Sequence, residues 1–301
     1  MRLPQLARAA VIAVGFVLAI PAVAAAQEQA RPELDSAPAQ VSFRSTAVVT
    51  GHMENGTGGE KVTLQKYKGG GWIKLLTRSV DEDGDVSFRL EDLTRTAEYR
   101  LKSKTPDGEP TFSRGRARIQ VEARVTLEAS RRHVMSGRRV TLSGVALPKR
   151  SDRRVILQKR VGGEWRFVTE LSTADGHFTR EVRMNNTGRR AFRVLFRGDE
   201  NNSKAADKAR VHVYDPDPAT WYGPGFYGNR TACGKRLRRG TLGVAHRSLP
   251  CGTEVSLLHH GRTITVPVID RGPYSEADWD LTEETADRLR FEGSKTVGVT
   301  R

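Results

Sequence analysis

The sequence predicts a mainly β protein in which two β-sandwich domains precede a third β domain. A block of about 90 residues occurs twice, which indicates two copies of one fold. Within each copy, short segments alternate apolar and polar residues between glycine turns, as β-hairpins do. The last part of the chain alternates in the same way and holds the only two cysteines. With 301 residues, 37% hydrophobic and 28% charged, the chain is long enough for three soluble domains.

The N-terminus is typical of a secretory signal peptide. Arg2 and Arg8 supply positive charge, residues 9–20 are apolar, and small residues before Gln27 offer a cleavage site. The apolar run is short for a membrane-spanning helix, which is the alternative interpretation. We expect residues 1–26 to be a cleaved signal peptide, residues 27–40 to be a polar linker, and the secreted protein to have no stable membrane insertion.

Two copies of an immunoglobulin-like β-sandwich are predicted at residues 41–122 and 123–214. Four landmarks recur at a constant offset of 93 positions: Leu64-Gln65-Lys66 and Leu157-Gln158-Lys159, Trp72 and Trp165, Tyr99-Arg100-Leu101 and Phe192-Arg193-Val194, and Gly51 and Gly144. Short alternating strands in a domain of this size are typical of such a sandwich. The two tryptophans are expected to anchor the cores, with sugar platforms as the alternative.

A proline-rich joint, Tyr214-Asp215-Pro216-Asp217-Pro218, ends the second copy. Prolines so close together favour a stiff, extended chain, so we place a domain boundary here and assign residues 215–301 to a third domain.

The cysteines Cys233 and Cys251 lie 18 positions apart in this third domain. In an exported protein such a pair is expected to form a disulfide, which would stabilise the fold by about 3 kcal/mol in the loop-entropy model. A metal site with a histidine and a catalytic thiol are the alternatives; we expect neither metal nor cofactor.

Two alternating segments of the third domain end in ionisable residues. Leu242, Val244 and His246 share one face of the first segment, and Ile264, Val266, Val268 and Asp270 share one face of the second. A carboxyl group at the end of an apolar face is partly desolvated, which suits a general acid. A bulge near Pro267 or Gly243 would reverse the face assignment. The alternative is that Asp270 caps a turn and His246 is a core residue.

A helix is predicted after Asp280-Leu281, with Thr282 as its N-cap and the acidic pair Glu283-Glu284 in its first turn. Residues 296–299 then form a closing strand.

These motifs together resemble a known family. They are Trp221-Tyr222-Gly223, Thr231-Ala232, Ala245-His246, Leu249-Pro250, Gly252-Thr253, Asp270-Arg271-Gly272-Pro273 and Asp280-Leu281-Thr282. They look like the rare lipoprotein A (RlpA)-like domain, a six-stranded double-psi β-barrel related to barwin and expansin domains. The resemblance implies a cell-wall-associated protein acting on peptidoglycan, since some members are lytic transglycosylases that cut between N-acetylmuramic acid and N-acetylglucosamine.

The resemblance also implies roles for individual residues. Asp270 and His246 match the active groove, so we expect Asp270 to act as acid and then base, with His246 orienting it or binding substrate. Asp280 is expected to be structural. The remaining predicted substrate-binding residues are Trp221, Tyr222, Phe226, Tyr227 and Arg271.

One departure from the family favours a rival interpretation. Active members commonly read Thr-Ala-Asn-Gly-Glu where this chain has Thr231-Ala232-Cys233-Gly234-Lys235, so a lysine replaces a carboxylate. The rival is a non-catalytic, expansin-like module that binds peptidoglycan or other carbohydrate.

The net charge of +15 is spread along the chain and carries no recognition motif. We therefore expect no nucleic-acid partner. Peptidoglycan glycan strands and anionic cell-wall polymers are the candidate partners.

Overall fold

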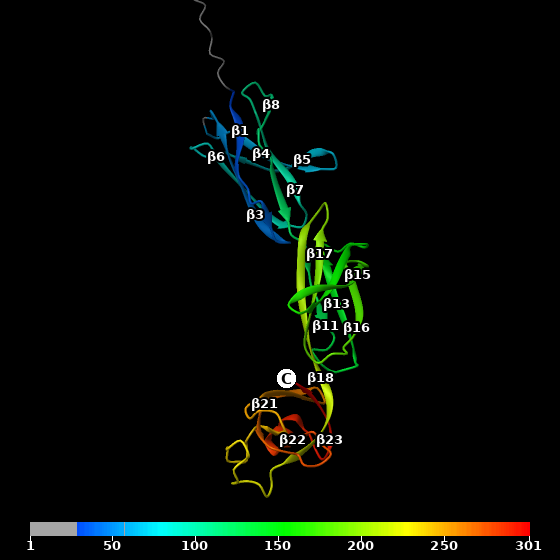
Figure 1. The fold of residues 1–301 in the computed structure, drawn as a ribbon. Coiled ribbons are helices and arrows are strands. Elements are labelled where there is room, and N and C mark those ends of the chain that lie inside the picture. Colours follow the sequence, from blue (N-terminus) through cyan, green and yellow to red (C-terminus); the bar gives the residue numbers. More distant parts are fainter. Residues whose placement is uncertain (1–28, 57) are drawn as a thin grey trace, which may run out of the picture.

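The computed structural model describes residues 29–56 and 58–301, which are almost entirely β. Three hydrophobic cores follow one another along the chain, within residues 47–121, 123–213 and 219–299 (Figure 1). We propose the predicted domain boundaries on this basis. The predicted signal peptide lies outside the described residues, and in the part that is described no helix has the length and apolar character needed to cross a membrane.

The first sandwich packs two sheets against each other. One sheet has the order β1-β3-β6, formed by β1 (Arg31–Ser36), β3 (Ser45–Glu54) and β6 (Asp85–Leu93). The other has the order β2-β9-β7-β4-β5, with β8 paired to β7; its strands are β2 (Gln40–Val41), β4 (Lys61–Lys68), β5 (Gly71–Ser79), β7 (Ala97–Lys104), β8 (Pro110–Phe112) and β9 (Ala117–Val121). Inward residues such as Val49, Leu64 and Phe88 are fully buried between them.

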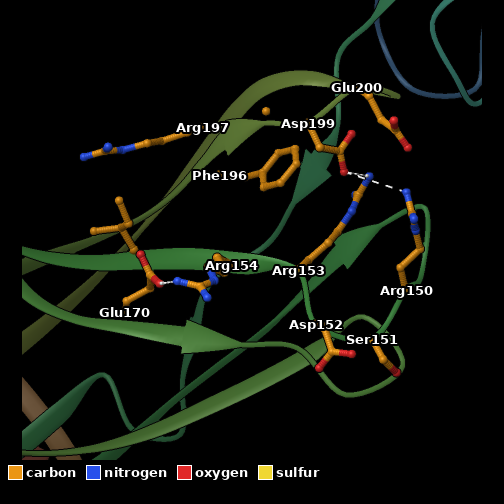
Figure 2. Close-up of a pocket in the computed structure, with 12 residues that line it drawn as sticks. Arg150, Ser151, Asp152, Arg153, Arg154, Glu170, Phe196, Arg197, Asp199 and Glu200 are labelled. Atoms are coloured by element: carbon orange, nitrogen blue, oxygen red, sulfur yellow. Dashed lines mark hydrogen bonds and ion pairs between the residues drawn. The ribbon is translucent and has the colours of Figure 1, made fainter.

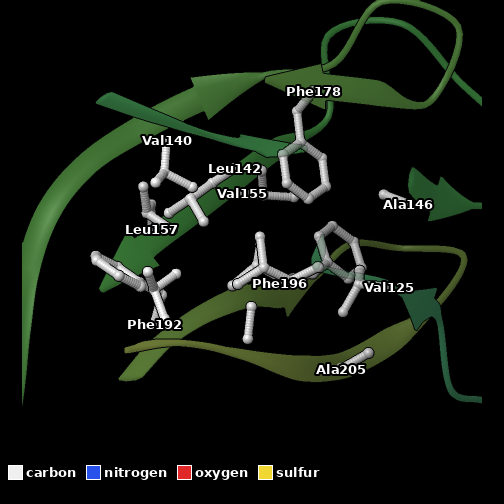
Figure 3. Close-up of a cluster of buried hydrophobic side chains, with 14 of the residues drawn as sticks. Val125, Val140, Leu142, Ala146, Val155, Leu157, Phe178, Phe192, Phe196 and Ala205 are labelled. Atoms are coloured by element: carbon white, nitrogen blue, oxygen red, sulfur yellow. The ribbon is translucent and has the colours of Figure 1, made fainter. Parts of the chain in front are cut away.

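The second sandwich repeats this architecture, and its apolar side chains gather in a core of their own (Figure 3). Its smaller sheet comprises β10 (Arg124–Val125), β11 (Glu128–Ala129), β13 (Arg139–Leu147) and β16 (His177–Arg183). Its larger sheet has the order β15-β14-β17-β18, formed by β14 (Arg154–Val161), β15 (Glu164–Ser172), β17 (Gly188–Gly198) and β18 (Ser203–Tyr222), with β12 (His133–Met135) beside β18. The hairpin register shifts after Leu64 in the first copy and after Leu157 in the second, so even this irregularity keeps the 93-residue offset.

The recurring glycine is explained by close packing. A β-carbon on Gly51 would collide with the carbonyl oxygen of Glu33, and one on Gly144 with that of Thr126. Only glycine lets the two backbones approach so closely.

The recurring tryptophans are not core residues, and that prediction was wrong. Trp72 and Trp165 belong to none of the three cores and are half-buried on the outer faces of their sheets. Arg100 lies 4.4 Å from the Trp72 ring centre, and Arg193 lies 4.7 Å from that of Trp165. The period-2 pattern identified the strands, but a half-exposed tryptophan held by arginine fits an outer face equally well.

Two segments expected to be connectors are instead strands. Residues 31–36 of the expected linker form β1, which pairs with β3. The proline-rich joint lies inside β18, a single strand of 20 residues. Asp215, Pro216, Asp217 and Pro218 pair with β23 on one side, so the second sandwich continues into the third domain through hydrogen-bonded backbone.

The two sandwiches meet at a charged turn (Figure 2). Asn202, 1% exposed, donates from its amide to the carbonyl of Thr94 in the first copy at 2.9 Å. Arg153, 5% exposed, holds this turn by donating to Asn202 at 2.7 Å and to Asp199 at 3.0 Å. Asp199 also lies 4.0 Å from Arg150, so the hollow lined by Arg150, Arg153 and Asp199 belongs to this joint; Nε and Nη1 of Arg153 are buried there without a partner in the described part of the chain.

The third domain is a closed barrel. Its strands connect in the ring β18-β22-β19-β21-β20-β23 and back to β18, which makes six. They are the end of β18, β19 (Val244–Ala245), β20 (Glu254–His259), β21 (Arg262–Asp270), β22 (Trp279–Thr282) and β23 (Lys295–Thr300). Helix α1 (Glu283–Leu289) begins at the predicted N-cap Thr282, whose hydroxyl accepts the Thr285 N–H. The predicted six-stranded barrel is confirmed.

We predict that Gly51→Ala lowers the free energy of unfolding of the first sandwich by about 1–3 kcal/mol, because the added methyl group must displace packed backbone. Thermal or urea unfolding followed by Trp72 fluorescence measures it. Gly71→Ala is the matched control, since nothing lies within 4 Å of a β-carbon there. Equal effects of the two substitutions would contradict the close-packing explanation.

Candidate active site

A shift in strand register places Asp270 on the outside of the barrel. Val244 pairs with Val268 and both are fully buried inside, but the next residue, Ala245, pairs with Asp270 rather than Ile269. The extra residue on β21 reverses the alternation of faces. The prediction that Asp270 shares the face of Val266 and Val268 was therefore wrong.

Asp280 lies on the same outer face as Asp270. Ala245 pairs with Asp280 on its other side, so the two aspartates flank one small residue across three adjacent strands. Their α-carbons are two strand spacings apart, about 10 Å, which leaves room for a substrate atom between the side chains. The Thr220 hydroxyl donates to Asp280 Oδ1 at 2.8 Å.

Burial raises the pKa of Asp280, and the nearby Asp270 carboxylate raises it further against the opposing effect of the Thr220 hydrogen bond. A carboxyl group that keeps its proton to higher pH is a better proton donor at the pH of the cell surface. The sequence predicts a structural role for Asp280; the helix is capped by Thr282, and Asp280 lies close enough to Asp270 for the two carboxyl groups to interact electrostatically.

The predicted disulfide is confirmed, and it supports this site. Cys233 and Cys251 are bonded, with their α-carbons 5.7 Å apart. Next to the bridge, the Ala232 N–H donates to Asp270 Oδ1 at 2.8 Å, and the Arg271 N–H donates to the same oxygen at 2.8 Å. The bridge thus tethers the loop that orients the Asp270 carboxylate.

His246 does not orient the Asp270 side chain. Its Nδ1 accepts the backbone N–H groups of Ser248 and Leu249, both at 3.1 Å, and its ring packs 4.5 Å from that of Trp279. Burial lowers its pKa, with Arg301 adding to the effect, so the ring is neutral and Nε2 carries the proton. His246 reaches Asp270 only through the backbone, its N–H donating to the Asp270 carbonyl at 3.2 Å.

Arg271 links the backbone at His246 to the disulfide. Its guanidinium donates to the His246 carbonyl at 3.3 Å and to the Cys251 sulfur at 3.5 Å. A role in substrate binding stays a prediction.

Of the predicted aromatic residues, Tyr222 and Phe226 lie together near the acid pair, whereas Trp221 lies on the other side of β18. Tyr222 lies beside the acid pair: burial raises the pKa of its hydroxyl, and the carboxylates of Asp270 and Asp280 raise it further. Phe226, 55% exposed, packs edge-on against Tyr222 at 6.1 Å. Trp221 is 38% exposed and points to the opposite side of β18 from Tyr222.

Three buried hydroxyls lie in this part of the barrel without a hydrogen-bond partner at normal geometry among the residues that the structure describes: those of Tyr222, Tyr227 and Thr231. Buried polar groups are normally satisfied, and a bound water molecule is the partner expected for such enclosed hydroxyls. Thr231 was noticed in the sequence only as part of a motif, because its burial comes from the loop that the disulfide tethers. Lys235, which replaces the family's glutamate, is exposed.

No group of three or more metal-ligating side chains occurs in residues 29–56 and 58–301.

Comparisons with known proteins agree with this geometry. Residues 218–300 match the family model described as lytic transglycolase. A probable endolytic peptidoglycan transglycosylase RlpA of Synechocystis is 49% identical over 82 residues, which are 24% of this chain and 26% of that relative. The endolytic peptidoglycan transglycosylase RlpA of Campylobacter jejuni is 38% identical over 84 residues, 27% of this chain and 30% of the relative. The matched segment spans under a third of the length of either relative.

Among solved structures, a tetra-tandem repeat from the extending region of a large adhesion protein covers 90% of this chain and 73% of its own, at 11% identity and a TM-score of 0.35. A TM-score this low does not establish a shared fold.

The closed six-stranded ring, with two aspartates on its outer face, is a double-psi β-barrel of the class whose family model is described as lytic transglycolase. More particularly, residues 218–300 form an RlpA-like domain, as the motifs predicted.

We predict that Asp280→Asn changes barrel stability in a pH-dependent way. Because the folded-state pKa of Asp280 is raised, its contribution to stability is greatest below the unfolded-state pKa, near 3.9, and is lost as pH rises through the folded-state pKa. The difference in melting temperature, variant minus wild type, should therefore be more positive at pH 7 than at pH 3 by differential scanning calorimetry. Asp287→Asn, at an exposed helix position, controls for removal of one charge; an unchanged difference across pH would contradict the prediction.

Proposed function

We propose that the protein is exported, associates with the cell wall and cleaves peptidoglycan glycan strands as a lytic transglycosylase. The observation that carries this proposal is the pair Asp270 and Asp280, which flanks Ala245 on the outer face of an RlpA-like barrel. The names of the relatives point to the same substrate. The predicted N-terminal leader supports export.

The acid pair divides the chemistry into two proton transfers. Asp280, whose pKa is raised, donates its proton to the oxygen that links N-acetylmuramic acid to N-acetylglucosamine, and the glycosidic C1–O bond breaks. Asp270 accepts the proton of the 6-hydroxyl as that oxygen bonds to C1, which leaves a 1,6-anhydro ring and a free 4-hydroxyl on the other sugar. The reaction consumes no water. It therefore needs no carboxylate to activate a water molecule, unlike hydrolysis by inverting glycosidases.

Other residues assist these transfers. The neutral His246 can donate from Nε2 to the substrate. Phe226 offers an exposed ring for stacking. This proposal divides between two residues the acid and base roles that the sequence assigns to Asp270 alone; the pairing of both aspartates with Ala245 supports it.

A non-catalytic, expansin-like carbohydrate-binding module is the second candidate. The exposed Lys235, at a position where active relatives carry a carboxylate, is the observation that favours it.

Digestion of purified peptidoglycan, with and without stem peptides, tests the enzyme. The wild type should release 1,6-anhydromuramic products, detected by mass spectrometry. Asp270→Asn and Asp280→Asn should each lower the rate by about 10²–10⁴-fold, because each removes one proton transfer. His246→Ala should reduce it less, and Asp287→Asn should leave it unchanged.

Sedimentation with cell-wall sacculi distinguishes the two candidates. Binding without anhydro products under any condition, retained in Asp270→Asn, would favour the binding module and overturn the enzyme.

A further inference from the structure

The outer face of the larger sheet of the second sandwich carries a row of cations. Register pairing places Arg193 opposite both Gln158 and Lys208, and directly opposed residues share a face. Arg160 and Arg210 follow two residues after Gln158 and Lys208, so they lie on the same face. We define these four cations, Arg160, Arg193, Lys208 and Arg210, as the basic face.

The cations of the basic face are ordered but not neutralised. The Arg193 guanidinium donates to the neutral Gln158 Oε1 at 2.9 and 2.6 Å and lies 4.7 Å from the ring centre of Trp165; Lys208 lies 5.9 Å from the same ring. Within the described part of the chain, none of the four forms an ion pair with a carboxylate. The tryptophan and glutamine thus fix the positions of positive charges whose counter-ion must come from outside.

The charge continues along β18 into a hollow of about 590 Å³, where Arg132, Lys208 and Arg210 outnumber the one carboxylate, Glu128, and His133 and His212 complete the polar lining. Burial lowers the pKa of His212, and His133, Arg189 and Arg210 lower it further, which reflects the positive potential there. Alternate residues of a strand are about 6.6 Å apart, so Lys208, Arg210 and His212 form a line suited to a ligand with several anionic groups.

The first sandwich has the corresponding arrangement in weaker form. Arg100 donates to Gln65 at 2.9 Å and lies over Trp72, while Arg116 lies 5.4 Å from the same ring. Here Glu98 comes within 4.0 Å of Arg116 and offsets part of the charge. The position equivalent to Glu98 in the second copy, 93 residues on, is Ala191. The second copy therefore has the stronger site.

We propose that the basic face of the second sandwich binds a linear anionic polysaccharide of the cell wall, one whose repeating unit carries a phosphate or carboxylate. The positive charge of this face is complementary to a polyanion. Phe167, which pairs with Gln158 on the same face and is 65% exposed, offers an aromatic ring for stacking against the sugars of the polymer. The location at the wall rests on the proposed function; the binding itself does not require the barrel to be active.

Co-sedimentation of the mature full-length protein tests the proposal. It should bind sacculi that carry phosphate-bearing polymers more tightly than sacculi stripped of them, and added salt should weaken that binding. A soluble poly(glycerol phosphate) and polygalacturonic acid, as competitors, distinguish phosphate from carboxylate recognition, with dextran as the neutral comparison.

The double substitution Arg193→Gln with Lys208→Gln should weaken binding at least tenfold, and Arg100→Gln with Arg116→Gln should weaken it less. Arg180→Gln with Arg183→Gln, exposed on β16 of the other sheet, is the matched control for net charge. The Arg193/Lys208 variant should keep wild-type activity on stripped peptidoglycan, which separates this site from the barrel.

Three outcomes would overturn the proposal: an equal loss in the Arg180/Arg183 control, competition by dextran as strong as by the polyanions, or preferential binding of single-stranded nucleic acid.

Discussion

The backbone hydrogen bonding of β18 is the constraint on which the rest of the structure depends. This one strand closes the larger sheet of the second sandwich against β17 and then closes the barrel between β22 and β23. Because a polar backbone group buried without a partner costs free energy, the strand cannot bend freely between the two domains. Lys208 and Arg210 of the basic face, and Thr220, which hydrogen-bonds Asp280, therefore lie at defined positions along one continuous strand.

The acid pair shows how this barrel combines stability with chemistry. Burial of a carboxyl group opposes its ionisation, a neighbouring carboxylate adds to that effect, and the raised pKa of Asp280 reflects both. The opposing forces come from nearby elements: the Thr220 hydroxyl fixes Asp280, while the tethered loop donates two N–H groups to Asp270. Charge pairs that push pKa values apart are typical of functional sites.

The two proposed binding surfaces use opposite charges for complementary tasks. The barrel offers carboxyl groups suited to a glycan strand, whereas the second sandwich offers cations suited to a polyanion. A wall that contains both polymers would hold the protein through the sandwich while the barrel meets its substrate. The weaker copy in the first sandwich, offset by Glu98, indicates that the repeats share a scaffold but not an equal affinity.

The sequence by itself determined the β class, the repeat, the disulfide pair, the N-cap Thr282 and the RlpA-like barrel, because each rests on local periodicity or on motifs read along the chain. Only the tertiary structure decided which way the key side chains point. One extra residue between Val268 and Asp270 reverses a period of two, and local pattern cannot reveal it. Pairing between strands far apart in the chain decides three further features, which no single segment encodes. These are the position of Asp280 near Asp270, the outward position of Trp165 and the continuity of β18.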